Sequence, residues 1–519
     1  MHDCKALPRS EVLNRADPFY GYSILLRSIV YVGVPLFMAL QFVRIRRALH
    51  VFQLEGYKRK RFLEWCRANA GRARFLRPMT TKKPLAMTGR AWRILIAASL
   101  LNLVAVLVLP GVAHIAWGWP SDIGIWALMT ALCIFATPRL LVVADIAVSP
   151  IQNAINNGYL RKAQRKLAEI QPTVIGVTGS FGKTSTKFAI EGLLGPPTSV
   201  LATPGSFNTP LGVCRTVNEN LEPSHRFFVV EMGAYGEGEI AELVDFVRPT
   251  IGVLIAIGPA HLERFGSIET IARAKYEIVR DLPTEGVAVM NVDDERVRAL
   301  ADSTSHVKVV RYGLDPAGRP DVSAAGVQTT SEGTTFTLKV RGEEVDVSMG
   351  LLGRHALGHV LAAVAVAIES GRTPAELKES IAGLRPVDHR LQIIKGPGGV
   401  TVIDDAFNSN PEGAAAALDV LGAMPGKKKV VVTPGIIELG DLQAEANEEF
   451  GLHAARVADV VIVVAKTNRE AISVGAGANG SAEVIAVASL AEAQERLKEV
   501  LRPGDVVLFE NDLPDQYEG

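Results

Sequence analysis

The sequence predicts an α/β protein that is preceded by N-terminal transmembrane helices. Apolar stretches long enough to span a membrane occur before residue 150, and the mean hydropathy of +0.20 is high for a soluble enzyme. After Pro172, short β-branched runs alternate with segments rich in alanine, glutamate and arginine. Such alternation is typical of a parallel sheet whose strands are connected by helices. The 519-residue chain is long enough for roughly two to four domains.

Three apolar stretches are expected to span the membrane, at residues 24–43, 94–116 and 123–143. About 20 apolar residues in a helix cross the hydrocarbon core of a bilayer. Arg27 and Arg139 lie near stretch ends, from where their side chains can reach the headgroups. The alternative for each stretch is a buried core helix. A cleavable signal peptide is disfavoured, because a strongly basic segment follows the first stretch where a cleavage site would need small residues.

The distribution of charge predicts the orientation in the membrane. Residues 44–93 are dense in lysine and arginine, and their acidic residues are Glu55 and Glu64. Short basic loops stay in the cytoplasm, so three spans would leave the N-terminus outside and everything after residue 143 inside. Anionic membrane lipids are an expected partner of such a loop. We therefore expect a multi-pass protein of the cell membrane.

The overall composition disfavours several other classes of protein. The formal net charge is zero, with 55 basic and 55 acidic residues, so no nucleic-acid partner is expected. The four cysteines (Cys4, Cys66, Cys133 and Cys214) are scattered and form no CxxC pair. A disulfide framework and a zinc ribbon are therefore disfavoured.

The first unit after Pro172 indicates a phosphate-binding loop. A β-branched run at 173–178 is followed by the turn GSFGKTST at 179–186 and by a helical segment up to residue 194. In such loops backbone N–H groups and the helix N-terminus bind phosphate, while Lys183 would neutralise charge and Thr184 would reach Mg²⁺. Val177 stands where the common pattern has its first glycine, so the loop is a variant. The other expected nucleotide-binding residues here are Thr178, Gly179, Ser180, Gly182 and Ser185.

Further polar residues follow later strands of the predicted sheet. Glu231 ends the apolar run that begins at Phe228, and an acid at the carboxyl end of a strand near such a loop is placed to bind the metal. His261 follows the strand at 251–257, Lys275 lies on the helical stretch 268–279, and Asn291 ends a further strand. Residues 316–344 are expected to form a β-hairpin.

These motifs, taken in order, resemble the Mur ligase family. Within it the likeness is greatest to the D-alanyl-D-alanine-adding (UDP-N-acetylmuramoyl-tripeptide) ligases. The resembling segments are residues 178–187, 205–213, 231–243, 257–278, 291–297, 351–367, 388–392, 404–411 and 436–440. The resemblance implies a P-loop central domain that binds ATP at 172–387 and a Rossmann-like C-terminal domain at 388–519. A membrane region at 1–150 would replace the UDP-binding domain of the family, with a basic linker at 151–171.

The resemblance also implies a reaction. ATP phosphorylates a substrate carboxylate, an amine attacks the acyl phosphate, and an amide bond forms as phosphate leaves. The amine donor would be an amino acid or a dipeptide. The roles implied for single residues are a first Mg²⁺ at Thr184 and Glu231, a second at His261, ATP contacts by Asn291, Arg390 and Asp405, and catalytic positions at Lys183, Asn208, His261 and Lys275. Lys275 matches a position that is carbamylated in several members.

Departures from the family pattern affect the expected substrates. Ala356 and His359 stand where the adenine-side motif has asparagines, and the tail LFENDLPDQYEG lacks the usual basic segment. The leading hypothesis is an amide ligase of cell-envelope synthesis, with cytoplasmic catalytic domains and a membrane-presented, lipid-linked carboxylate. One alternative is the D-alanyl-D-alanine-adding step on a soluble UDP-linked peptide. A membrane P-loop ATPase for transport or signalling is disfavoured, because three spans make a poor pathway.

Overall fold

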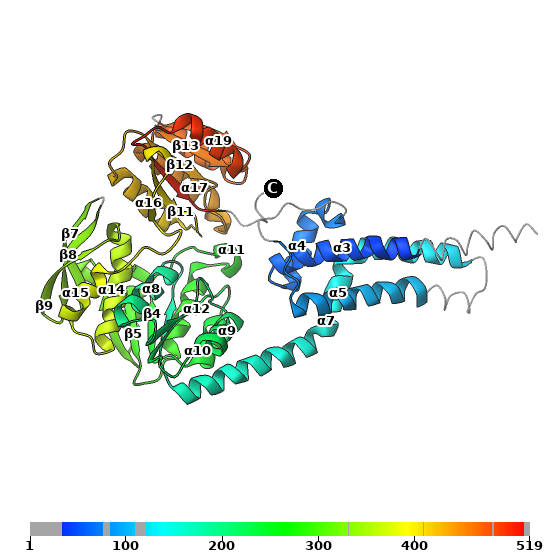
Figure 1. Ribbon diagram of the computed structural model, residues 1–519, viewed down its shortest axis with the longest axis horizontal. Helices are drawn as coiled ribbons and strands as arrows, with labels where there is room; N and C mark the ends of the chain where they lie inside the picture. The colour runs from blue at the N-terminus through cyan, green and yellow to red at the C-terminus, as the bar shows by residue number, and fades with distance from the viewer. Residues whose placement is uncertain are drawn as a thin grey trace, which may run out of the picture. The chain divides into compact units, whose positions relative to one another are not determined.

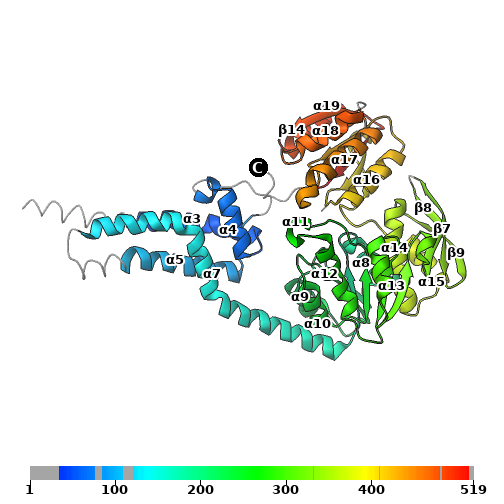
Figure 2. The same cartoon turned by 180° about the vertical axis from the view of Figure 1, so that it is seen from behind.

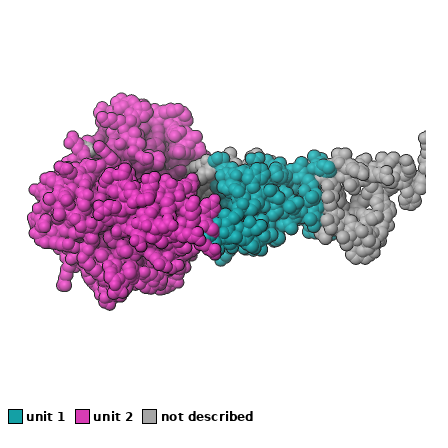
Figure 3. Space-filling model, turned by 60° about the horizontal axis from the view of Figure 1, so that its bottom comes forward, with its two compact units in different colours: residues 1–157 teal, residues 158–519 magenta. Residues whose placement is uncertain are grey.

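The computed structural model describes residues 34–75, 84–108, 121–330, 332–407, 409–479 and 482–512. The chain divides into two compact units, residues 1–157 and 158–519 (Figure 3). Of the expected membrane spans, residues 24–33 and 109–116 lie outside the described part of the chain.

The first unit is helical in its described residues. It contains α3 (Val34–Leu54), α4 (Arg59–Ala68), the 3₁₀ turn η2 (Arg72–Arg74), α5 (Gly89–Leu103), the π-helical turn η3 (Val104–Val108) and the first part of α7 (Ser121–Ile170) (Figures 1 and 2). Its core includes Phe52, Phe62, Ile94 and Leu141, all fully buried.

Two segments, the expected basic loop and the expected basic linker, contain helices that were not predicted from the sequence. The basic segment 44–93 continues α3 to Leu54 and contains α4 and η2. Its apolar residues Ile45, Ala48, Leu49 and Phe52 recur at helical spacing and are buried. The expected linker at 151–171 is the end of α7, where Leu160, Ala163, Leu167 and Ile170 pack on the core of the second unit. In both segments the apolar periodicity, and not the density of charge, determines the structure.

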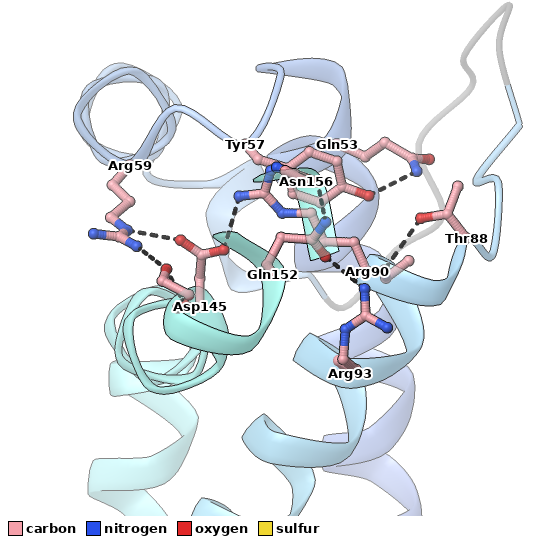
Figure 4. A network of polar contacts seen from close by, with 11 residues as sticks. Gln53, Tyr57, Arg59, Thr88, Arg90, Arg93, Asp145, Gln152 and Asn156 are labelled. Carbon is pink, nitrogen blue, oxygen red and sulfur yellow. Dashed lines mark hydrogen bonds and ion pairs between the residues drawn. The ribbon is translucent and has the colours of Figure 1, made fainter. Parts of the chain in front are cut away.

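A network of polar side chains ties α4, α5 and α7 together (Figure 4). Asp145 of α7 is 1% exposed, and its two oxygens accept from Arg59 Nε at 2.7 Å and from an amino group of Arg90 at 3.0 Å. Arg93 donates to Gln152 Oε1 at 2.5 Å. Because a buried carboxylate needs compensating charge, this pair of arginines lets Asp145 lie between the helices.

Two helices in the described residues are long and apolar enough, by length and composition, to cross a membrane. The apolar segments are Gly89–Val106 and Thr130–Ile170. In the most apolar 18 residues of each segment, 33% of the first and 28% of the second are buried inside the protein. They overlap the second and third expected spans. The described part of the first expected span, residues 34–43, forms the start of α3. This helix is not one of the two candidates. The multi-pass arrangement therefore stays a prediction.

The second unit begins with a nine-stranded sheet in the order β2-β3-β1-β4-β5-β6-β7-β8-β9. Neighbours from β2 to β7 pair in parallel, and β7, β8 and β9 form an antiparallel meander where a hairpin was expected. The strands are β1 (Thr173–Thr178), β2 (Val200–Ala202), β3 (Phe227–Glu231), β4 (Ile251–Leu254), β5 (Val287–Asn291), β6 (Lys308–Tyr312), β7 (Val322–Thr330), β8 (Gly333–Val340) and β9 (Glu343–Met349). We call residues 173–382 the first lobe.

Helices cover both faces of this sheet (Figures 1 and 2). One face packs against α8 (Lys183–Leu194), α14 (Gly353–Glu369) and α15 (Pro374–Ala382). The other packs against α9 (Pro210–Asn220), α10 (Glu239–Val247), α12 (Ile268–Arg280) and α13 (Glu295–Ser303). Strands buried on both sides are near-continuous apolar runs, as in β1 and β3. The carboxyl ends of the parallel strands are thereby left as the edge on which polar residues gather.

The second lobe, which we define as residues 388–512, contains a six-stranded sheet in the order β10-β11-β15-β12-β13-β14. Only β10 is antiparallel to its neighbour. Its strands are β10 (Gln392–Lys395), β11 (Thr401–Asp405), β12 (Lys429–Thr433), β13 (Val460–Val464), β14 (Glu483–Val487) and β15 (Val506–Glu510). Its helices are α16 (Pro411–Ala423), α17 (Gln443–Val457), α18 (Arg469–Asn479) and α19 (Leu490–Val500).

Candidate active site

The loop between β1 and α8 forms a tight turn at the carboxyl edge of the first sheet. Thr178 Oγ1 donates to the carbonyl of Met232 at 2.8 Å, and Ser180 Oγ donates to the carbonyl of Gly258 at 3.0 Å. Gly182 has a φ of +78°, a conformation that glycine adopts without strain. A Cβ on Gly179 would lie 3.2 Å from the backbone nitrogen of Ala256. The loop therefore requires its glycines and is anchored to β3 and β4.

Lys183 begins α8 and folds back over the loop. Its Nζ donates to the carbonyls of Gly179 at 2.8 Å and Ser180 at 3.2 Å. Burial lowers the pKa of Lys183, the charge of Glu231 opposes that effect, and the charge of Arg390 adds to it. Two half-buried cations thus lie within electrostatic range of one another at this loop, an arrangement that favours binding of an anion. Ser185 lies half-buried in the same first turn of α8.

Glu231, the last residue of β3, is a centre of hydrogen bonds. Its Oε2 accepts from Thr184 Oγ1 at 2.9 Å and from Lys187 Nζ at 3.2 Å, and its Oε1 accepts from Asn208 Nδ2 at 3.1 Å. Lys187 is fully buried and also donates to the carbonyl of Gly205. Three predicted site residues, Thr184, Asn208 and Glu231, are therefore in direct contact.

These residues suit Mg²⁺ better than a softer metal. Mg²⁺ prefers oxygen ligands and is usually held by one or two protein groups together with water and substrate phosphates. Thr184 and Glu231 supply oxygens beside the phosphate-binding loop. No group of three or more His, Cys, Asp or Glu side chains that could hold a metal occurs within the described ranges.

His261 lies on the same edge, before the short helix α11 (Leu262–Phe265). Its Nδ1 is hydrogen-bonded to the carboxylate of Glu438 in the second lobe, which also accepts from Arg264. Burial lowers the pKa of His261, and the bond to Glu438 opposes that effect. The ring of Tyr235 meets the imidazole edge-on, with 4.8 Å between ring centroids.

Lys275 is buried on α12, and its Nζ donates to the carbonyl of Ala234 at 3.4 Å. Burial, followed by the positive charge of Lys183, lowers the pKa of Lys275 to about 7. A large part of this lysine is therefore neutral near pH 7, which is unusual for the residue.

A pocket of about 450 Å³ adjoins the phosphate-binding loop. Its lining includes Phe181, Asn291, Asp293, Tyr312, His355 and His359. His359 Nδ1 lies 3.1 Å from Thr186 Oγ1, so the altered position of the adenine-side motif contacts α8. The Tyr312 hydroxyl is buried and makes no hydrogen bond within the described structure. The size of the pocket and its position beside the phosphate-binding loop suit a nucleoside.

The second lobe contributes Arg390 and Asp405. Asp405 ends β11, and its Oδ1 accepts from the backbone N–H of Leu391 at 3.1 Å. Burial raises the pKa of Asp405 to about 6, against the charge of Arg390. Burial lowers the pKa of Arg390, while the charges of Asp405 and Glu231 raise it. Arg390 therefore lies within electrostatic range of the first lobe's central carboxylate.

Three residues of this arrangement were not predicted from the sequence. Lys187 lies inside the recognised motif at 178–187, and Glu438 lies inside the motif at 436–440. The motifs indicated both segments, but the side-chain partners depend on the fold. Tyr312, the end of β6, carried no motif.

Comparison with known proteins agrees with this arrangement. Residues 177–367 match the Mur ligase middle domain, and residues 389–510 match the Mur ligase glutamate ligase domain. The chain is 37% identical over 360 residues to a UDP-N-acetylmuramoyl-tripeptide–D-alanyl-D-alanine ligase of Mycobacterium bovis, which covers 65% of this chain and 69% of that one. The Escherichia coli enzyme of the same name is 35% identical over 311 residues, covering 60% and 68%.

Solved structures give the same result. The MurF ligase of Thermotoga maritima in complex with ADP has a TM-score of 0.62 and 29% identity, over 69% of this chain and 80% of that one. A MurF structure from Acinetobacter baumannii has a TM-score of 0.62 and 27% identity, over 69% and 77%. The chain therefore belongs to the Mur ligase family of ATP-dependent amide-bond ligases, with a middle domain and a C-terminal domain of that family.

Proposed function

We propose that the chain adds a dipeptide of the D-alanyl-D-alanine type to the carboxylate of a UDP-linked muramoyl tripeptide in peptidoglycan synthesis. The curated relatives carry this activity in their names. The observation that carries the proposal is the convergence of Lys183, Thr184 and Asn208 around Glu231, faced by Arg390 from the second lobe. Because the chain is a Mur ligase, transport or signalling is no longer needed to explain its phosphate-binding loop.

In this proposal the loop and two cations bring two anions together. A substrate carboxylate and the γ-phosphate of ATP repel each other until their charge is compensated. Lys183 and Arg390 supply positive charge at the loop, and the backbone of Thr178, Gly179, Ser180 and Gly182 with the first turn of α8 would bind the phosphates. Thr184 and Glu231 would hold one Mg²⁺ and His261 a second, and bound Mg²⁺ supplies Lewis-acid charge compensation.

The amide bond then forms in two balanced steps. A carboxylate oxygen attacks the γ-phosphorus and ADP leaves, and the amine nitrogen then attacks the acyl carbon and phosphate leaves with loss of a proton. Asn208, 3.1 Å from Glu231, would contact the reacting carboxylate. Asn291 in the pocket and Asp405 on the second lobe would bind the nucleoside.

Lys275 is proposed to carry a carbamate. Its amine, with a pKa of about 7, would attack the carbon of CO₂ and lose a proton, giving an anion in place of a cation. A carboxylate-like group at this buried position would assist in positioning the metal. The positive charge of Lys183, which lowers the pKa of the Lys275 amine, would then attract the negatively charged carbamate.

The direct test measures phosphate release from ATP with a UDP-linked tripeptide and D-alanyl-D-alanine together. Phosphate release that needs both substrates, with a matching amide product, supports the proposal. Release that is independent of either substrate would overturn it.

A second candidate acceptor, a membrane-presented lipid-linked carboxylate, is favoured by one observation. The helical unit exposes large apolar side chains, such as Leu36 at 70% and Phe135 at 75%, beside an excess of arginine and lysine. A bilayer with anionic headgroups would cover such a surface. Confinement of enzyme and substrate to one membrane would then raise their effective concentration without new contacts.

One measurement separates these acceptors, and a second tests the orientation in the membrane. The values of kcat/KM for the UDP-linked tripeptide and for its lipid-linked equivalent, with the same amine, are compared in vesicles. A clear preference for the UDP-linked substrate would rule out the membrane-presented acceptor. A reporter that is active only outside the cytoplasm, fused to Gly519, should stay silent if the catalytic lobes are cytoplasmic.

A further inference from the structure

Glu438 of the second lobe is clamped between two residues of the first lobe. One carboxylate oxygen is hydrogen-bonded to His261 Nδ1 and the other accepts from Arg264. The backbone N–H of Glu263 also donates to the Glu438 carbonyl at 3.4 Å. Both carboxylate oxygens are thus used across the contact between the lobes, and Glu438 is 8% exposed.

The loop that carries Glu438 is held in place by buried asparagines. Asn447 Oδ1 accepts from the Ile436 N–H and its Nδ2 donates to the Ile436 carbonyl, both at 2.8 Å. Asn511 Nδ2 donates to the carbonyl of Gly435 at 2.6 Å. Glu438 has a φ of +64°, which costs a non-glycine residue about 1–2 kcal/mol. Such strain persists only where surrounding contacts fix the backbone, and it is common at functional sites.

His261 is fixed to a similar degree. Its φ is +60°, so two strained non-glycine residues meet at this contact. The Tyr235 ring packs edge-on against the imidazole, and the Arg264 guanidinium lies 4.4 Å from the centre of the same ring. With Nδ1 engaged by Glu438, Nε2 is the ring nitrogen left for a metal.

The carboxylate of Glu438 faces a donor on each of its two oxygens, the Arg264 guanidinium on one and the His261 imidazole on the other. A carboxylate paired with a guanidinium accepts hydrogen bonds, which places the proton of a neutral His261 imidazole on Nδ1. Histidines that bind metals commonly donate their other ring N–H to a carboxylate, which fixes the tautomer and the ring.

We propose that Glu438 is a positioning residue that orients His261 toward the metal, so that the second metal site is assembled only when the second lobe docks on the first. This inference rests on the proposed role of His261 as a metal ligand. Glu438 does not touch the metal or the substrates in this account, and it acts through His261. Metal binding and docking of the lobes would therefore be coupled.

The test titrates Mn²⁺, followed by its electron paramagnetic resonance signal, into the full chain saturated with a non-hydrolysable ATP analogue. We expect Glu438→Ala to weaken the weaker Mn²⁺ site by about 10-fold to 100-fold. Glu438→Gln, which keeps an acceptor but no charge, should lose less. Arg264→Gln is the matched control, because it removes the other arm of the clamp and leaves the His261–Glu438 bond. Thermal unfolding midpoints verify that each variant is folded.

The outcomes separate this inference from the proposed function. If His261→Ala weakens Mn²⁺ binding and Glu438→Ala does not, the positioning role is wrong and the metal assignment stands. If His261→Ala leaves Mn²⁺ binding unchanged, the metal assignment is wrong and the inference is overturned with it. If Arg264→Gln weakens Mn²⁺ binding as much as Glu438→Ala, Glu438 serves only to hold the lobes together. Dependence of phosphate release on both substrates tests the ligase reaction independently.

Discussion

Lys187 Nζ lies 3.2 Å from Glu231 Oε2, and both side chains are withdrawn from solvent. Burial lowers the pKa of Lys187, and the charge of Glu231 followed by their hydrogen bond opposes that effect. Lys187 also donates to the carbonyl of Gly205, in the segment that leads to Asn208. Lys187 follows Lys183 by one turn of α8. It therefore binds both the Glu231 carboxylate and the chain segment that leads to Asn208.

Replacing Lys187 with methionine should destabilise the protein strongly. The substitution keeps the length of the side chain but leaves the Glu231 carboxylate buried without its cation, a change that costs about 3–5 kcal/mol. The free energy of unfolding in denaturant measures this loss. The control is Arg215→Gln, which removes the exposed pair with Glu219 and should cost at most about 0.5 kcal/mol. Equal losses in the two variants would contradict the role of the buried pair.

Lys183→Ala should abolish phosphate release while the fold is kept. The variant removes a charge-assisted contact to phosphate, so the rate should fall about 10²-fold to 10³-fold or more. Burial lowers the pKa of Lys183, so its charged form is disfavoured in the fold and its removal should not lower the unfolding midpoint. Phosphate release with saturating substrates gives the rate, and Lys378→Ala, on the exposed side of α15, is the control. Near-normal turnover in Lys183→Ala would show that the loop does not bind phosphate.

Lys275 gives a prediction about pH and CO₂. Its pKa of about 7 in the folded chain lies below the ordinary lysine value of 10.5, so folding favours the neutral amine. Between pH values of about 7 and 10.5 the unfolded chain holds this proton and the folded chain has lost it. The contribution of Lys275 to stability therefore rises with pH in this range. CO₂ reacts only with the neutral amine, so carbamylation should fall as pH drops below about 7.

The measurement is the ¹³C resonance of a carbamate after addition of ¹³C-bicarbonate. The signal should appear in the unmodified chain, weaken below neutral pH and disappear in Lys275→Met. Activity in CO₂-depleted buffer should fall and recover with bicarbonate. A carbamate signal that persists in Lys275→Met would come from another amine.

Part of this site follows from the sequence because parallel strands end at one edge. The positions of Lys183 and Thr184 in the turn after β1, and of Glu231 at the end of β3, were enough to predict that they lie at the same edge of the sheet. Glu438 could not be paired with His261 in this way, since 177 residues separate them and the contact depends on how two lobes dock. The helical structure of residues 44–54 and 151–170 was not predicted, because their charge was weighed above their apolar helical spacing.

Gly182 and His359 predict a steric coupling at the phosphate-binding loop. A Cβ at Gly182 would lie 2.4 Å from His359 Cε1, and the φ of +78° adds strain for any other residue. Gly182→Ala should therefore weaken binding of a fluorescent ATP analogue. Adding His359→Ala should restore only part of the affinity, because a backbone cost of about 1–2 kcal/mol persists.

The double-mutant cycle needs His359→Ala alone, since that variant also loses the contact with Thr186. Gly236→Ala is the matched control, because a Cβ there meets nothing within 4 Å. Additive effects of Gly182→Ala and His359→Ala would show that the two positions do not interfere.

The helical unit predicts membrane association that depends on one face of α7. Leu128, Leu132 and Phe135 lie at helical spacing and are 55%, 49% and 75% exposed. If this face meets lipid, Phe135→Asp introduces a charge that costs about 2.5–3.5 kcal/mol at the centre of a spanning helix. That cost should shift the chain from the membrane to the soluble fraction after cell disruption. Val474→Asp places the same charge at a 52%-exposed apolar position of the second lobe and should change nothing. Recovery of the unmodified chain in the soluble fraction without detergent would mean that another surface covers these side chains.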